Sequence, residues 1–511
     1  MNDWSAGYVS DIDYTYGYYR ELNPAHIALA FLHAGIAFPE IGTACELGFG
    51  QGLSMNLHAA ASVMQWSGTD FNPAQASFAQ ELAQSTDSAI SVFDESFLDY
   101  SNRNDLPEFD YIGLHGIWSW VSDENRRIIV DFVRRKLKVG GVLYVSYNTL
   151  PGWATFAPMR HLLTEHASVL GSEGKGTVTR VDDALNFAQE LLKTNPLYGR
   201  VNPTAGERLT KLQEQNRHYL AHEYFNKDWH PMHFATMEKW LEPAKVQFAC
   251  SANYLDHIAV LNLSTEQQEF LQKITDPNFR ESVRDFMTNQ QFRKDYWVKG
   301  RRVLSPLDQA EKIRQLRVVL VKNRKDIELI VSGSAGAATL SEDIYVPILS
   351  KLESYNPMSL AELEAGLKDA KMNFVQLLQA IMVLMGAGHL EAVQSDDVIK
   401  RAHKQTTKLN RHLLKKARSS GDITYLASPV TGGGIAIGRF NQLFMLAIQE
   451  GRNDPAAWAQ YVMEILRLQG QKLVRDGKVI ESDADNLAEL QRQAVEFKDQ
   501  LLPMLKSLKI M

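Results

Sequence analysis

The sequence predicts an α/β fold in which helices cover both faces of a parallel sheet. A helical insertion interrupts this domain, and a mostly helical C-terminal half with a winged-helix-like segment follows it. Short apolar runs alternate with helical stretches from Thr43 onward, and strand, helix, strand repetition of this length builds parallel sheets. The strand pattern is lost after Pro151, and beyond about residue 264 the chain is mainly helical and charged.

The expected elements follow from hydrophobic periodicity and from helix-start signals. Asn23-Pro24 is typical of a helix N-cap with proline in the first turn, after an aromatic arm. The expected strands are Thr43–Leu47, Gln65–Thr69, Ile90–Phe93, Tyr111–His115 and Val142–Tyr147; the helices between them include Leu53–Met64, Pro73–Gln84 and Glu124–Lys136. After the insertion, a helix over Phe234–Leu241 and a strand pair, Lys245–Ser251 with His257–Leu263, would complete the sheet.

These elements divide the chain into six parts. We expect an aromatic arm and helix, a sheet domain in two pieces, a helical insertion between the pieces, a helical regulatory or linker region, a winged-helix-like domain and a helical C-terminal domain. Their expected ranges are 1–40, 41–165 with 232–263, 166–231, 264–340, 341–395 and 396–511.

Composition narrows the function classes. The 511 residues carry 54 Lys and Arg against 60 Asp and Glu, a net charge of −6, which argues against a partner held by a global basic field, such as nucleic acid or an anionic membrane. Two cysteines, Cys45 and Cys250, supply neither a disulfide framework nor a Cys-based zinc site. Without a signal-like start or an apolar run of about 18 residues, we expect a cytoplasmic protein with no stable membrane insertion.

A glycine-rich turn follows the first expected strand. It reads Glu46-Leu-Gly48-Phe-Gly50-Gln-Gly52, and such a turn lets a bulky ligand approach the main chain at a helix N-terminus. Dinucleotides and S-adenosylmethionine (AdoMet) both use turns of this kind, but the dinucleotide fingerprint needs Gly or Ala where this chain has Leu53. Asp70 ends the second strand, where a carboxylate can accept ribose hydroxyls. The pattern favours AdoMet over dinucleotides, and over a purely structural turn.

The turn together with Thr69-Asp70-Phe71 resembles class I AdoMet-dependent methyltransferases. Two later motifs, Phe109–Trp120 (FDYIGLHGIWSW) and Tyr144–Trp153 (YVSYNTLPGW), resemble bacterial methyltransferases that carry a methyltransferase regulatory domain, a group that includes protein-lysine methyltransferases acting on outer-membrane proteins. Further similar segments are His222-Glu223-Tyr224, Phe286–Phe292 and Ser428–Ile435. The resemblance implies a Rossmann-like sheet of seven strands.

The resemblance also implies cofactor contacts. Gly48, Gly50 and Gly52 would pass under the methionyl and ribose parts of AdoMet, while Glu46 orients the loop. Asp70 would hold the ribose with Phe71 beside the adenine. Ser96, next to Phe97, stands where many relatives place an acid that faces the adenine amino group. His115 would end the fourth strand close to the sulfonium.

The acceptor would bind where the fourth and fifth strands end, because ligands of open α/β sheets bind at the carboxyl edge. Methyl transfer is an in-line displacement that needs positioning and an amine without its proton. Tyr147, Asn148 and His115 are the expected catalytic residues. The expected substrate-binding residues are Trp118, Trp120, Trp153, Tyr16, Tyr19, His222 and Glu223. Core packing of these aromatics, and for Tyr16 and Tyr19 packing of the arm, is the alternative.

A lysine amine of a protein is the expected acceptor, since the large helical remainder suits a macromolecular substrate. A sugar or other small molecule is an alternative, and so is AdoMet binding without turnover. A homodimer is compatible with each. We expect no metal, because H-E-x-x-H fails at Asn226.

Three other segments are expected to be structural. The glycines of Ser428–Ile435 indicate a turn, because no Lys-Ser/Thr follows them. Lys400–Arg418 is typical of a solvated helix face, with an acidic partner as the alternative. The second winged-helix-like helix, near Asn373–Met385, has no Lys or Arg and is not expected to read DNA.

Overall fold

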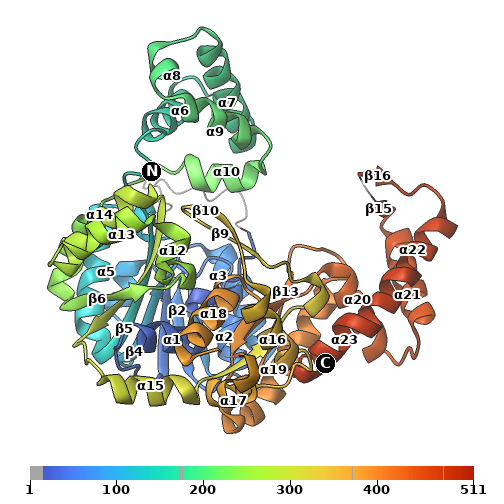
Figure 1. The fold of residues 1–511 in the computed structure, drawn as a ribbon. Helices are drawn as coiled ribbons and strands as arrows, with labels where there is room; N and C mark the ends of the chain where they lie inside the picture. The colour runs from blue at the N-terminus through green and yellow to red at the C-terminus, as the bar shows by residue number, and fades with distance from the viewer. Residues whose placement is uncertain (1–14, 172–173, 175, 371, 476) are drawn as a thin grey trace.

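The computed structural model describes residues 15–171, 174, 176–370, 372–475 and 477–511. Residues 1–14 of the expected aromatic arm lie outside this part of the chain. The body of the molecule is built on a seven-stranded sheet in the order β3-β2-β1-β4-β5-β7-β6 (Figure 1). Strands β1 to β5 are parallel, and β7 runs antiparallel to both β5 and β6. The expected α/β class and the seven-stranded sheet are confirmed.

Most expected elements occur within a few residues of their predicted bounds. The strands are β1 (Thr43–Leu47), β2 (Gln65–Thr69), β3 (Ile90–Phe93), β4 (Phe109–Leu114), β5 (Leu137–Asn148), β6 (Val246–Ser251) and β7 (Phe292–Lys299). The helices of the same body are α1 (Pro24–His33), α2 (Leu53–Ala61), α3 (Pro73–Gln84), α4 (Phe97–Ser101), α5 (Asp123–Lys136) and α11 (Phe234–Leu241). Asn23 caps α1 by accepting from the Ala25 N–H, as its sequence predicts.

The predicted strand over His257–Leu263 is wrong. This stretch forms the end of a 3₁₀ turn (Tyr254–His257) and the short helix α12 (Ala259–Asn262). The Asn262 side-chain amide donates to the backbone oxygens of Leu255 and Ile258, which favours the turns over an extended chain. The strand that completes the sheet is instead β7, which lies between β5 and β6. In the sequence it comes after residue 263, where the sheet domain was expected to end. Its charged start, Arg293-Lys294-Asp295, conceals the apolar pattern of a buried strand.

The two faces of the sheet bury different side chains, because successive strand residues point to opposite sides. One core holds Ala44, Tyr111, Tyr144 and Tyr296 together with α1 and apolar residues from beyond residue 310. The other core holds Cys45, Ile112 and Val145 together with α5 and α11. Both free cysteines are buried.

The insertion stands away from the sheet body and has its own core (Figure 1). It consists of α6 (Ala157–Val169), α7 (Thr177–Lys193), α8 (Leu197–Val201), α9 (Pro203–Gln213) and α10 (Arg217–Tyr224). Trp153, Phe156, Leu185 and Leu209 pack together there. Helices α13 (Thr265–Gln272) and α14 (Pro277–Thr288) then lead the chain back to β7.

The C-terminal half packs against the sheet body, and the segment 455–496 extends outward before the chain returns to the body at its C-terminal end (Figure 1). Its helices are α15 (Pro306–Gln315), α16 (Glu342–Leu352), α17 (Leu360–Gly366), α18 (Phe374–Gly386), α19 (Asp396–Lys416), α20 (Arg439–Gln449), α21 (Pro455–Leu468), α22 (Asp483–Glu496) and α23 (Leu502–Ser507). Its strands are β8 (Arg317–Leu320), β9 (Ile330–Gly333), β10 (Gly336–Thr339), β11 (Met358–Ser359), β12 (Leu390–Ala392), β13 (Tyr425–Ser428), β14 (Gly433–Ala436), β15 (Val474–Arg475) and β16 (Lys478–Val479).

The second helix of the winged-helix-like segment is α18, and its apolar face is buried as expected. Leu377, Ile381 and Leu384 belong to the same core as α1 and the sheet. The exposed positions of α18, which include Val375, Gln376 and Gln379, carry no Lys or Arg for phosphate contacts.

The glycine-rich hairpin of β13 and β14 lies against α2 and against residues 15–23, which we call the strap. A Cβ on Gly433 would stand 2.2 Å from the Tyr18 hydroxyl oxygen, and one on Gly434 would stand 3.0 Å from Leu57 Cδ1. The Asn23 side-chain amide donates to the Thr431 carbonyl at 3.0 Å. The glycines therefore permit close approach of the strap, which agrees with the structural interpretation of this motif.

Gly433→Ala tests this packing. The added methyl group collides with the Tyr18 hydroxyl, so we expect the free energy of unfolding to fall by about 1–3 kcal/mol, measured by urea denaturation. Gly438→Ala is the control, because a Cβ there meets no atom within 4 Å. Equal stability of the two variants would contradict the role given to Gly433.

Candidate functional site

The loop after β1 has left-handed backbone at each of its three glycines. Their φ angles are +71° at Gly48, +59° at Gly50 and +66° at Gly52, a region that side chains rarely adopt. A Cβ on Gly48 would lie 2.5 Å from Ile117 Cδ1, and one on Gly52 would lie 2.5 Å from Ala79 Cβ. Helix α2 begins at Gly52 without a side-chain cap. The loop thus presents bare main chain at a helix N-terminus.

Two buried carboxyl groups face this loop from the ends of β1 and β2. Asp70 accepts from the Gly50 N–H at 2.9 Å and from the Asn72 N–H at 3.0 Å, through different oxygens. Burial raises the pKa of Asp70 to about 6. Burial, together with the nearby charge of Asp70, raises the pKa of Glu46 to about 8. Within the described residues, Glu46 Oε2 is buried without a hydrogen-bond partner. A polar ligand at this position would satisfy it.

The remaining residues expected around the cofactor lie at the ends of β2 and β3. Phe71 follows Asp70 and is half-buried. Ser96 is exposed and caps α4, accepting from the Asp99 N–H and donating to Asp99 Oδ2 at 2.7 Å. Phe97 packs beside the core that contains Tyr100. A contact of Ser96 with adenine stays a prediction.

His115 follows β4 in a group of aromatic side chains. The Tyr19 ring stacks on it with centroids 3.6 Å apart, and Phe292 approaches edge-on at 6.3 Å. His115 Nδ1 and the Tyr144 hydroxyl share a hydrogen bond of 2.8 Å. Burial lowers the pKa of His115 to about 3, so the ring is neutral at physiological pH. The Tyr19 N–H donates to Ser54 Oγ at 2.8 Å, which ties this group to the first turn of α2.

An ion pair lies beside this aromatic group. Lys294 of β7 contacts Glu21 of the strap at 2.5 Å. Burial opposes ionisation of Glu21, but Lys294 and His115 outweigh it and hold the pKa of this carboxyl near 2. The site residues predicted from the sequence did not include Glu21, Lys294 or Phe292. Only the position of Phe292 at the end of the FMTNQQF segment pointed toward the site.

Tyr147 and Trp118, two residues expected at the acceptor, lie in the core of the sheet. Tyr147 is 1% exposed, and its hydroxyl donates to Asp295 Oδ2 at 2.8 Å. Trp118 is 0% exposed and packs at a right angle to Trp240. The alternating directions of strand residues place Tyr147 on the α5 and α11 side of the sheet, away from Tyr144. Both side chains are therefore part of this core, and their expected roles in catalysis and substrate binding stay predictions.

Asn148 and Trp153 connect the sheet to the insertion. Asn148 Oδ1 accepts from Trp153 Nε1 at 3.0 Å, and the Asn148 N–H donates to Ser119 Oγ at 2.8 Å. The Arg208 guanidinium lies 3.8 Å above the Trp153 ring and donates to the Tyr224 hydroxyl at 3.0 Å. Sequence reasoning gave no signal for Arg208, whose partners come from distant segments.

The other residues expected to bind substrate are distributed around this junction. His222 is buried in α10, and Glu223 next to it is half-buried, with its pKa raised to about 7 by burial. Trp120 lies 6.4 Å from Trp229. Tyr16 packs edge-on against Phe78 of α3 at 4.9 Å, so of the two strap tyrosines it is Tyr19 that stacks on His115.

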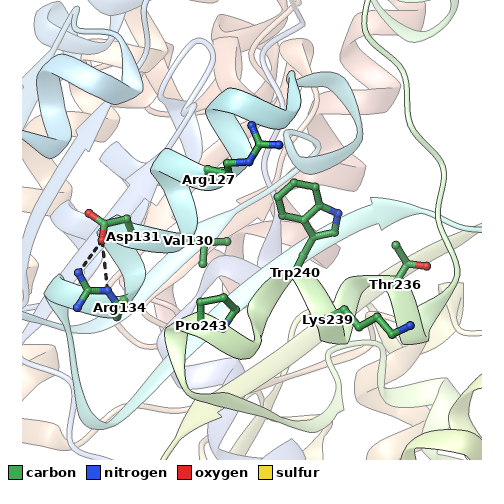
Figure 2. Close-up of a pocket in the computed structure, with 8 residues that line it drawn as sticks. All are labelled: Arg127, Val130, Asp131, Arg134, Thr236, Lys239, Trp240 and Pro243. Carbon is green, nitrogen blue, oxygen red and sulfur yellow. Dashed lines mark hydrogen bonds and ion pairs between the residues drawn. The ribbon is translucent and has the colours of Figure 1, made fainter.

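A pocket of about 420 Å³ opens elsewhere, between α5 and α11 (Figure 2). Val130, Trp240 and Pro243 line it together with Arg127 and Lys239, and Asp131 pairs with Arg134 at its edge. None of the residues expected to bind cofactor or substrate lines it.

Among the described residues, no three or more His, Cys, Asp or Glu side chains lie together so that they could hold a metal ion. Among the helices of the described part, none has the length and apolar character to cross a membrane.

Comparison with known proteins identifies the family. An uncharacterized protein of Synechocystis, sll1526, is 39% identical to this chain, and the alignment covers 99% of both. The chain belongs to the family of this protein. A second relative in Rickettsia prowazekii, the uncharacterized protein RP789, is 23% identical over 93% of this chain and 88% of its own length. Residues 216–299 match the family described as a predicted methyltransferase regulatory domain.

A solved structure supports the fold. PKMT2 from Rickettsia typhi, determined in complex with AdoHcy, aligns with a TM-score of 0.68 and 18% identity over 98% of this chain and 99% of its own. The class I methyltransferase fold and the accompanying regulatory domain, both expected from sequence motifs, are confirmed. The matched segment is no separate domain, because it includes β6 and β7 of the central sheet.

Tyr147→Phe distinguishes a structural role of the Tyr147 hydroxyl from a catalytic role. Loss of the hydrogen bond to Asp295 should lower the free energy of unfolding by about 1–3 kcal/mol, because the acceptor is a buried carboxyl group. We expect methyl transfer by the folded variant to stay near the wild-type rate, measured at a temperature where both proteins are fully folded. Normal stability combined with lost turnover would instead assign Tyr147 a direct catalytic role.

Proposed function

We propose that this protein transfers a methyl group from AdoMet to a lysine amine of a protein substrate. One observation carries the proposal. The bare glycine loop and its two buried carboxyl groups adjoin an aromatic group built on His115, at the carboxyl edge of the sheet where class I methyltransferases work. The cytoplasmic location and the homodimer expected from the sequence are part of the same proposal.

The residues around the loop fit AdoMet. Each Asp70 oxygen accepts one backbone N–H, which leaves a lone pair on each for a ribose hydroxyl. Glu46 Oε2, unpartnered among the described residues, suits a donor such as an ammonium group. When bound, AdoMet supplies a methyl group on a sulfonium, which is already a strong electrophile.

The work left to the protein is positioning and desolvation. A lysine amine has a solution pKa near 10.4 and must lose its proton before it attacks. Aromatic walls of Tyr19, His115 and Phe292 disfavour the charged ammonium and hold the amine in line. Glu223 on α10 is the carboxylate we assign to bind the incoming ammonium and to take up its proton.

Three observations support a protein acceptor. The solved structure with the same fold over the whole chain is named PKMT2. The sequence motifs resemble protein-lysine methyltransferases. The site also lies beneath an insertion that adds surface to the edge of the sheet (Figure 1).

The experiment is to incubate the protein with labelled AdoMet and a lysate of its source organism. We expect label in protein, at lysines mapped by mass spectrometry. Label confined to small molecules would assign the sugar or small-molecule alternative, and no label with normal AdoMet binding would indicate a protein without turnover.

Asp70→Asn tests the cofactor site. The substituted amide loses the charge and opposes a backbone N–H with its own N–H, so AdoMet affinity by calorimetry should fall by about ten- to a hundredfold. Wild-type affinity should also fall as pH drops through about 6, because Asp70 then becomes protonated. Asp397→Asn, at an exposed position in the first turn of α19, is the control. Unchanged affinity in Asp70→Asn would refute the assignment.

Glu223→Gln tests the acceptor carboxylate. Glu223 ionises as pH rises through about 7, so kcat/KM of the wild type should rise across that pH. In the variant this limb should disappear and kcat/KM should be lower by about tenfold or more, with AdoMet affinity unchanged. Glu190→Gln, on the exposed surface of α7, is the matched control. Identical pH profiles for wild type and Glu223→Gln would exclude the role.

A further inference from the structure

A second hollow, of about 460 Å³, lies between the insertion and the sheet body. Helices α9 and α10 form its walls, and Gln291 in the loop before β7 closes one side. The side chains that line it are mainly polar and include Arg208, Lys211, Gln215, Tyr219 and Tyr224. None of these residues belongs to the cofactor site described above.

Arg208 is held rigidly in this hollow by neutral groups. Its guanidinium lies 3.8 Å above the Trp153 ring and 4.7 Å above the Phe156 ring. It donates to the Tyr224 hydroxyl, and the Gln291 side-chain oxygen accepts from it at 2.8 Å in the amide orientation that satisfies both groups. In the described part of the chain no carboxylate pairs with Arg208. A half-buried guanidinium without a counter-charge is a recognition group for carboxylates.

The side chains that line the hollow carry a net positive charge, whereas the whole molecule carries a net negative charge. The protein carries a net charge of −6. Among the lining residues, Arg208 and Lys211 outnumber the one acid, Glu207. Lys211 is exposed at the rim, where its charge adds attraction for an anion.

The hollow adjoins the acceptor end of the site. Gln291 immediately precedes Phe292, whose ring contacts His115. Trp153, beneath Arg208, donates to Asn148 at the end of β5. Tyr219 lies near Glu223 and near Tyr19. A polypeptide that presents a side chain to His115 would therefore pass this hollow.

We propose that the hollow between α9, α10 and Gln291 binds an Asp- or Glu-bearing stretch of the polypeptide substrate next to its target lysine. Arg208 takes the carboxylate, Lys211 strengthens the attraction, and the Tyr219 and Gln215 side chains are placed to hydrogen-bond peptide groups. This inference rests on the proposed function, because it presumes a polypeptide acceptor. It predicts that the methylated lysines have an acidic residue within a few positions.

The test measures binding without turnover. The probe is a fluorescein-labelled peptide of alternating Gly and Glu around one Lys, and its partner has Gln in place of Glu. In fluorescence anisotropy the full-length protein should bind the Glu peptide about three- to tenfold more tightly than the Gln peptide at low salt. Lys211→Glu should abolish this preference without disturbing the fold, because Lys211 is exposed. Arg208→Gln should abolish it as well.

Lys193→Glu, an exposed charge reversal on α7 of the same insertion, is the control and should retain the preference. Equal binding of the two peptides by the wild type, or equal effects of Lys211→Glu and Lys193→Glu, would overturn the inference. The lysate experiment distinguishes it from the proposed function. Label that enters protein equally in wild type and Lys211→Glu refutes the hollow alone, whereas the expected peptide preference without any label in protein refutes lysine methylation alone.

Discussion

The complete burial of α2 is the constraint on which the site depends. Every residue of this helix is buried, although most helices of a globular protein keep one face in water. The sheet covers one side, and α19 with the β13–β14 hairpin covers the other. Gln405 donates to the carbonyls of Ala59 and Ser62, and Gln394 donates to that of Ala61. The end of α2 therefore obtains its hydrogen bonds from the C-terminal half. Because α2 begins at the glycine loop, the C-terminal half is structurally part of that loop's support.

The strap extends this dependence to the acceptor side. Three consecutive strap residues contact three different parts of the molecule. Tyr18 packs against Tyr425 of the hairpin, with centroids 4.9 Å apart. Tyr19 bonds Ser54 of α2 and stacks on His115. Arg20 donates to the Met385 carbonyl and pairs with Glu391 of β12. A displacement of α18 or β12 would therefore pull on the residue that covers His115.

How much the sequence predicted depended on where each signal lies. The glycine loop and Asp70 were found because backbone geometry alone restricts the residues of a tight turn, and this restriction is local. Strand β7 was missed because its charges are neutralised only by contacts that form in the folded chain. Glu281, Asp285 and Asp295 surround Arg293, and Glu21 pairs with Lys294.

The sequence correctly placed Tyr147 at the carboxyl edge of the sheet, but a motif does not show which face a strand residue occupies when both faces are buried. Arg208 had no local signal, because Trp153, Tyr224 and Gln291 meet it only in the folded chain.

The segment matched as a regulatory domain contributes two walls to the proposed acceptor site. It begins at α10, which carries Tyr219 and Glu223, and it ends with β7, which begins at Phe292 and carries Lys294.

The same segment contains a buried cluster in which Arg293 of β7 is shared by three carboxyl groups. One guanidinium cannot neutralise three carboxylates, and burial raises the pKa of Asp285 to about 7, with Arg293 opposing that rise. This arrangement anchors β7 firmly between β5 and β6. The insertion is attached through Trp153 and Arg208, and in the described part of the chain no carboxylate pairs with Arg208. The proposed acceptor site thus has one wall on the sheet, fixed by buried ion pairs, and a second wall on α10 of the insertion.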